Sequence, residues 1–132
     1  MANEYGPSII VGIEANADLS AAANQYKFVK LTSAKVALCA AATDIPIGVL
    51  QNKPKAGETA DVLALGVSKV RSDANLVAQD LIGTAADGEA DAKVPGTDTT
   101  EYVVGMVLID TSAAAGDYTT AYINCLNPHR AA

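Results

Sequence analysis

The apolar residues of this chain fall into short runs separated by turn-forming residues, and this spacing constrains the fold more than any other feature. Residues 60–70 read ADVLALGVSKV, in which Leu63, Leu65 and Val67 recur at every second position, the spacing of a β-strand. The last run, residues 118–126, alternates in the same way and is rich in β-forming residues. These runs predict an all-β chain.

Turn residues join the predicted strands in pairs. Residues 26–31 and 35–41 flank the sequence TSA, which predicts a tight hairpin connection. Residues 46–51 and the ADVLALGVSKV run flank NKPKAGE, where Pro54 is placed to begin a turn and Gly57 to end it. The pattern predicts antiparallel neighbours throughout.

Helices are only weakly indicated. Residues 19–25 and 72–83 could each form two or three turns, although 72–83 suits short extended segments equally well. Residues 84–101 are polar and predict an exposed excursion, whereas 102–109 form an uninterrupted apolar run of buried-strand length. The sum is a small β-barrel of about seven to nine short strands with an extended N-terminal arm and at most one or two short helices.

A chain of 132 residues fits one domain. We expect residues 1–25 to form the N-terminal arm and the segment leading into the barrel. The barrel itself is predicted over residues 26–126, and residues 127–132 form a C-terminal tail.

The composition limits how large the core can be and which classes of partner the protein can bind. Half of the residues are apolar but only 5% are aromatic, which predicts a thin core that depends on good sheet pairing or on neighbouring subunits. The net charge of −6 repels phosphate backbones and anionic lipids, so we expect neither a nucleic-acid nor a membrane partner. We identify no signal peptide and no apolar segment of transmembrane length, which predicts synthesis and folding in a cytoplasm.

No pattern of residues indicates catalysis, so we expect no enzymatic activity, no cofactor and no metal. The only histidine, His129, lies in the C-terminal tail, where a catalytic role is improbable. The acidic residues 87–91 lack the spacing of a calcium loop and predict a turn with solvated carboxylates. Cys39 and Cys125 favour two partly buried thiols in a reducing cytosol, with a disulfide as the alternative.

The segment DIPIGVLQNKPKAGETADVLALGVSKV, residues 44–70, carries residues that determine the local course of the backbone. Pro46 stands at the start of a strand and Gly57 in the turn. Gly48 and Gly66 are expected where a strand bends or two backbones approach closely. The segment offers no nucleophile, metal ligand or phosphate-binding loop.

These residues resemble the bacteriophage capsid decoration (cement) proteins of the β-tulip type. The resemblance begins with F-V-K-L at residues 28–31 and extends over about residues 26–124, through DGEADAK and GMVLIDTSAAAGDYTTAYI, in which Gly105 and Gly116 stand. The central matching residues are Pro46, Ile47, Gly48, Val49, Leu50, Asn52, Pro54, Ala56, Gly57 and Glu58.

The resemblance implies a β-tulip barrel similar in architecture to the lambda-type head decoration proteins. It implies a structural virion protein that binds the major capsid protein on the outer surface of an assembled phage head and stabilises the shell. It also implies assembly on the capsid as a homotrimer, after synthesis in the cytoplasm of a bacterial host. The alternative is a surface-displayed binding module, for example one that recognises glycans; the tyrosines and the phenylalanine mostly lie inside predicted strands, which counts against it.

The N-terminal arm, MANEYGPSIIVG, carries apolar groups that a free polar tail would not need. In lambda-type decoration proteins the similar arm becomes ordered on the capsid and adds a strand to a capsid sheet. The resemblance therefore implies capsid contacts by Asn3, Glu4, Tyr5, Pro7, Ile9 and Ile10. We expect residues 2–8 to be mobile in the free protein and ordered on the head; the alternative is that residues 9–13 form the first strand of the protein's own barrel.

Overall fold

A computed structural model describes residues 7–109 and 116–132. Its regular elements are almost entirely strands, joined by one short 3₁₀ turn, η1. In chain order they are β1 (Ile9–Glu14), η1 (Ala22–Asn24), β2 (Phe28–Thr32), β3 (Lys35–Leu38), β4 (Gly48–Leu50), β5 (Thr59–Arg71), β6 (Leu81–Thr84), β7 (Ala90–Ala92), β8 (Tyr102–Val103), β9 (Gly105–Val107), β10 (Tyr118–Asn124) and β11 (His129–Arg130).

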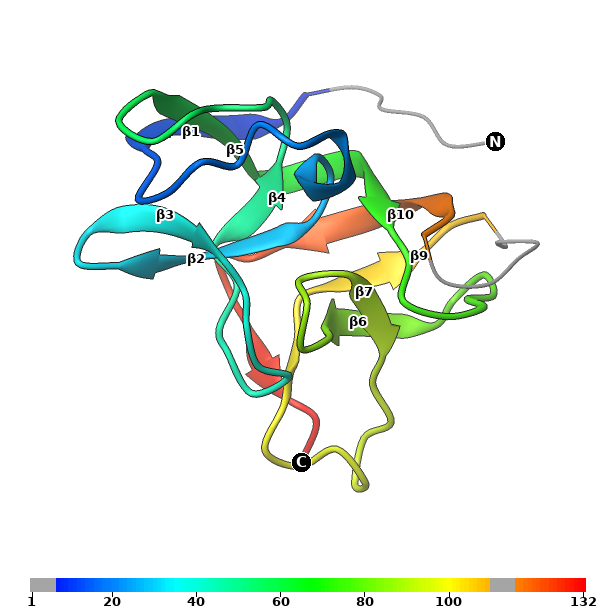
Figure 1. Cartoon of the computed structure of the whole chain (residues 1–132). Helices are drawn as coiled ribbons and strands as arrows, with labels where there is room; N and C mark the ends of the chain where they lie inside the picture. The colour runs from blue at the N-terminus through cyan, green and yellow to red at the C-terminus, as the bar shows by residue number, and fades with distance from the viewer. Residues whose placement is uncertain (1–6, 110–115) are drawn as a thin grey trace.

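The strands form one strongly curled antiparallel sheet in the order β3-β2-β4-β5-β10-β9-β6-β7, with β1 added to β5 (Figure 1). A separate pair, β11 and β8, lies toward the C-terminal end of the molecule. The predicted all-β class and small β-barrel are confirmed by this curled sheet, as is the near absence of helix. No helix in residues 7–109 or 116–132 is long and apolar enough to cross a membrane.

The 13-residue strand β5 organises the sheet because it pairs with three other strands. Leu63 is opposite both Ile10 of β1 and Val49 of β4, so these two strands lie on opposite edges of β5. The second half of β5, from Leu65 to Arg71, pairs with β10. The period-two pattern of residues 60–70 therefore does correspond to a strand, and that strand is longer than predicted.

The predicted hairpin at TSA is confirmed between β2 and β3. Its central residues Ser33 and Ala34 have φ values of 52° and 60°, which is the sign that the tight two-residue hairpin turns require. In the second predicted turn, Gly57 has a φ of 84°, and the backbone N–H of Glu58 donates to the carbonyl of Lys55. Pro54 therefore precedes this four-residue turn and does not lie within it.

Residues 72–83 contain no helix, which decides against the helical alternative. Gln79 has a φ of 74°, a value incompatible with a right-handed helix. A local turn forms instead, in which the Asp80 carboxylate accepts the N–H of Val77 at 3.0 Å and the Val77 carbonyl accepts the N–H of Asp80. This turn leads into β6.

The apolar run at 102–109 does not form one strand, as the sequence predicted, but two. β8 pairs with β11, whereas β9 pairs with β10 and β6. The chain changes partners at Val104, which is buried and donates its N–H to the carbonyl of Ile82. An apolar run cannot reveal this change because every residue in it favours burial.

The prediction of an exposed excursion over residues 84–101 is wrong for residues 84–93. This part contains β7 and the buried residues Thr84, Glu89 and Lys93. Part of the remainder, from Val94 to Gly96, is exposed as expected.

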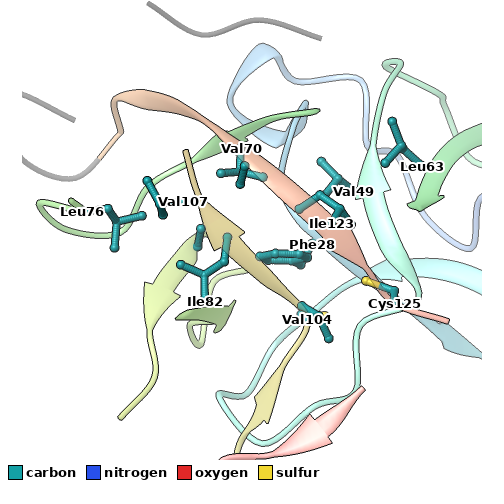
Figure 2. Packing of buried hydrophobic residues seen from close by; sticks show 13 residues of the cluster. Phe28, Val49, Leu63, Val70, Leu76, Ile82, Val104, Val107, Ile123 and Cys125 are labelled. Atoms are coloured by element: carbon teal, nitrogen blue, oxygen red, sulfur yellow. The ribbon is translucent and has the colours of Figure 1, made fainter. Parts of the chain in front are cut away.

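Two apolar clusters lie on either side of β5. Val62 belongs to one cluster and its neighbour Leu63 to the other, so the two faces of β5 contribute side chains to different clusters. The larger cluster surrounds Phe28, the only phenylalanine of the chain (Figure 2). The remaining members of both clusters are aliphatic residues and cysteines, which agrees with the thin core predicted from composition.

Both cysteines are free and buried, more deeply than the sequence suggested. Burial raises the pKa of the Cys39 and Cys125 thiols to about 12, so almost no thiolate exists at neutral pH. We expect a maleimide at pH 8 to label the folded protein at least about 100-fold more slowly than free cysteine, and both thiols to react at once after unfolding. Rapid stoichiometric labelling of either thiol in the folded state would contradict this account.

Candidate functional site

The predicted capsid-contacting arm is described from Pro7 onward. Asn3, Glu4 and Tyr5 lie outside the described residues. Ile9 and Ile10 lie in β1, which pairs with β5 from Ile9 opposite Leu65 to Glu14 opposite Thr59. The alternative, a first strand of the protein's own sheet, therefore holds for these residues.

Although β1 is paired, its side chains are poorly covered. Ile9, Ile10 and Val11 are 45%, 52% and 37% exposed, and consecutive residues of a strand point to opposite faces. Apolar groups are therefore exposed on both faces of β1. A strand that served only the protein's own core would bury at least one of its faces.

The outer edge of β1 is also open. Within the described part of the chain, β1 pairs only with β5, and an isolated bridge from Ala15 to Val36 follows its end. The edge from Ile9 to Ile13 contains no charged residue and no proline, the two features that usually protect an exposed edge from further pairing. This edge can accept a strand from another protein.

The residues of the 44–70 motif have structural roles around β4 and β5. The Asn52 side chain donates to the Thr59 carbonyl at 3.0 Å and accepts the N–H of Asp61 at 2.9 Å. The Glu58 carboxylate accepts the N–H of Lys55 at 2.7 Å, which closes the turn. Pro46 and Pro54 are buried.

The glycines of the motif permit close contacts. A Cβ on Gly48 would lie 2.5 Å from the Leu63 carbonyl oxygen, and one on Gly105 would lie 2.3 Å from that of Tyr122. Gly66 and Gly116 have φ values of 141° and 96° and lie against Ser8 and Arg71 respectively. All of these residues shape the sheet, and none presents a reactive group.

The acidic residues of DGEAD differ from the solvated turn that the sequence predicted. Oxygens of Asp73, Asp87 and Glu89 lie within 4.8 Å of one another, and Glu89 is buried. Desolvation, followed by the nearby Asp87, raises the pKa of Glu89. Arg71 Nε lies 3.4 Å from a Glu89 carboxylate oxygen in an ion pair, but neither of these two buried atoms forms a hydrogen bond to a described residue. Clustered acidic groups are common without a bound ion, so their proximity alone assigns no metal to this cluster.

The remaining candidates for chemistry are the two thiols, which belong to the same apolar cluster, and His129, which lies outside it. His129 is exposed on β11, at the edge of the small β8–β11 pair. The two thiols lie in the core and carry no charge at neutral pH. The described residues therefore offer surfaces for binding, of which the open edge of β1 is the first.

Comparison with known proteins bears on the fold of the chain. No family model and no curated protein matches the sequence. A solved structure, the N base of the head fibre protein gp8.5 of bacteriophage phi29, has a similar fold, with a TM-score of 0.62 and 18% sequence identity. The alignment covers 90% of this chain and 96% of that one. The chain therefore shares, over nearly its whole length, the fold of a protein that belongs to a phage head.

Proposed function

We propose that this chain is a structural protein of a phage virion that binds the outer surface of the assembled head and stabilises the shell. The observation that carries the proposal is the fold shared with the head fibre base over 90% of the chain. The resemblance of residues 26–124 to decoration proteins also supports the proposal, because it rests on the sequence and not on the fold. The proposed partner is the major capsid protein, and the protein is made in the cytoplasm of the bacterial host.

The mode of attachment that the geometry favours is the addition of a capsid strand to β1. Its outer edge carries no charged residue from Ile9 to Ile13, and pairing along it would satisfy backbone hydrogen bonds on both partners. Ile9 and Ile10 would place apolar side chains on the two faces of the new strand pair. Asn3, Glu4, Tyr5 and Pro7 would extend the contact beyond the sheet.

Assembly as a homotrimer on the head would multiply these contacts. Several weak sites on one oligomer bind a repeating surface far more tightly than each site alone. Phe28 is the one fully buried aromatic residue of the described core, with Tyr26 partly buried against it, and so small an aromatic content supports the idea that the protein gains stability from its neighbours. Mass measurement of the protein stripped from heads tests this assembly state.

Deleting residues 2–6 should weaken binding to undecorated heads at least about tenfold, because the capsid contact loses its outer half. The melting temperature should change by less than about 2 °C, since the β1–β5 pairing begins at Ile9. Substituting residues 2–6 with a Gly-Ser sequence of equal length is the matched control for chain length, and it should bind as weakly as the deletion. Unchanged binding of both variants would refute a role for the arm.

The glycan-binding alternative receives less support. Tyr122 is 55% exposed and could serve as an aromatic platform, which the sequence did not suggest. Beside it lies a hollow of about 500 Å³, however, and among the described side chains that line this hollow only Asn124 and the Tyr122 hydroxyl are polar. A sugar requires several convergent hydrogen-bonding groups, so the surface suits an apolar protein partner better.

A further inference from the structure

The second half of the curled sheet closes on itself next to the end of β5. From β5 the sheet continues through β10, β9 and β6 to β7, its last strand. Ala90 of β7 then forms an isolated parallel bridge with Ser72, the residue that follows β5. The N–H of Asp73 donates to the Ala90 carbonyl at 2.8 Å. In the turn before β7, the Gly88 carbonyl accepts the N–H of Phe28 at 2.7 Å, so the β6–β7 hairpin is joined here to both β5 and β2.

Three carboxylates converge at this closure of the sheet. Oxygens of Asp73, Asp87 and Glu89 lie within 4.8 Å of one another. They come from the segment after β5, from the β6–β7 turn and from the position just before β7. Negative charges at such distances repel one another, most strongly where water is excluded. We call these three residues the acidic closure.

Glu89 is the member of the acidic closure for which a negative charge is least favourable. It is 8% exposed, and its buried Oε2 atom forms no hydrogen bond with any described residue. Arg71 Nε lies 3.4 Å from this oxygen and offsets part of the charge, without a hydrogen bond between the two atoms. A buried carboxylate oxygen that lacks a hydrogen bond is costly when charged and much less costly when the carboxyl is protonated.

The surrounding groups make Glu89, and not Asp87, the residue that takes up a proton. Burial raises the pKa of Glu89, and the neighbouring Asp87 carboxyl raises it further. The charges of Arg71 on β5 and Lys27 ahead of β2 oppose this rise without cancelling it. Burial alone would also raise the pKa of Asp87, but hydrogen bonds from the backbone and side chain of Glu89, followed by the charge of Lys27, lower it instead.

The pKa of Asp73 is shifted in the same direction as that of the buried glutamate. Burial raises it, the carboxylates of Asp87 and Asp91 add to the rise, and Lys93 opposes it. Asp117 also adjoins the closure, where its backbone carbonyl accepts hydrogen bonds from the segment that follows β5. Two of the three carboxyls in the acidic closure therefore bind a proton more readily in the folded protein than in the unfolded chain.

We infer that the acidic closure is a pH-sensitive joint: a proton taken up there tightens the contact of the β6–β7 hairpin with the end of β5, and loss of that proton loosens it. The joint follows from the fold alone, so it does not depend on the proposed function.

The direction of the pH dependence follows from the raised pKa values of Glu89 and Asp73. A carboxyl whose pKa is raised by folding stabilises the folded state as the pH falls through the raised value. The gain is complete near the ordinary values of 4.5 for glutamate and 3.8 for aspartate. Asp18, Asp44 and Asp87 have lowered pKa values, so the stability that they contribute is lost only as the pH falls past 3.8. The folded state should therefore gain stability between pH 7.5 and pH 5.

Thermal unfolding of the full-length protein at pH 7.5 and at pH 5 tests the inference. The unchanged protein should unfold at least about 3 °C higher at pH 5, the size of shift that one proton-linked group produces in a domain of this length. Glu89→Gln places a neutral amide of nearly the same shape in the joint. It should raise the unfolding temperature at pH 7.5 and reduce the difference between the two pH values by at least about half. Asp61→Asn removes the same charge from an exposed position of β5 and is the matched control, whose pH dependence should equal that of the unchanged protein.

Hydrogen exchange locates the effect in the unchanged protein, so it decides the matter even if Glu89→Gln fails to fold. Protection of the Asp73 and Phe28 amides should fall at least about fivefold from pH 5 to pH 7.5, after correction for the intrinsic exchange rate. The Gln51 amide, which donates to the Asp61 carbonyl in the other half of the sheet, should keep its protection. Unchanged protection at Asp73 would overturn the inference. Equal pH dependence in the Glu89→Gln and Asp61→Asn variants would also overturn it, because the overall negative charge would then be the cause.

Discussion

Replacing Glu101 with alanine is expected to lower the free energy of unfolding by about 3 kcal/mol, because it leaves a buried lysine without its nearest partner. The side chain of Lys93 is fully buried, and its ammonium contacts Glu101 directly. Its other partner, Asp91, is 3.4 Å away and 37% exposed. The lysine stem passes over Gly83, where a Cβ would lie 3.0 Å from Lys93 Cε, so the side chain has little room to turn toward solvent.

Two variants test this explanation by urea denaturation. Asp91→Ala should cost less than about 1 kcal/mol, because that carboxylate is more distant and better solvated. The double variant Lys93→Met/Glu101→Leu should recover most of the loss, since it removes both charges together. An equal loss in Glu101→Ala and Asp91→Ala would show that the buried ion pair is not the cause.

Gly105→Ala is expected to cost at least about 3 kcal/mol or to prevent folding, because the new methyl group would meet backbone. Its Cβ would lie 2.3 Å from the Tyr122 carbonyl oxygen and 3.3 Å from Ile82 Cγ1. Neither strand can move away without breaking the β9–β10 pairing. Circular dichroism and thermal unfolding measure the effect.

Gly96→Ala is the matched control for this substitution. A side chain at Gly96 is disfavoured only by the backbone φ of 84°, because an added Cβ would meet no atom within 4 Å. Alanine there should cost about 1–2 kcal/mol. If the two variants lose equal stability, the close approach at Gly105 is not what requires glycine.

The strands that the sequence predicted best are those whose signals are local. The β2–β3 hairpin and β5 follow from period-two alternation and from turn residues, and both can be read within about ten positions. The break at Val104 and the loop before β6 could not be predicted, because they depend on which distant strand each segment pairs with. Lys93 shows the same limit, since its burial requires Glu101 and Gly83 together.

The candidate surface was predictable only in part. The apolar residues of the arm were visible in the sequence, but the sequence indicated the pairing of Ile9 and Ile10 with β5 only as an alternative. Tyr118 and Tyr122 alternate with buried residues of β10, and this period-two signal could have placed them on an outer face.

Electron cryomicroscopy of undecorated heads, imaged with and without the purified protein, tests the central claim most directly. The account predicts added density on the outer surface at repeated symmetry positions, with β1 turned toward the shell. It further predicts that decorated heads withstand a higher temperature before they release DNA. Heads that acquire no added density at saturating protein, under conditions where the protein is folded, would contradict the account.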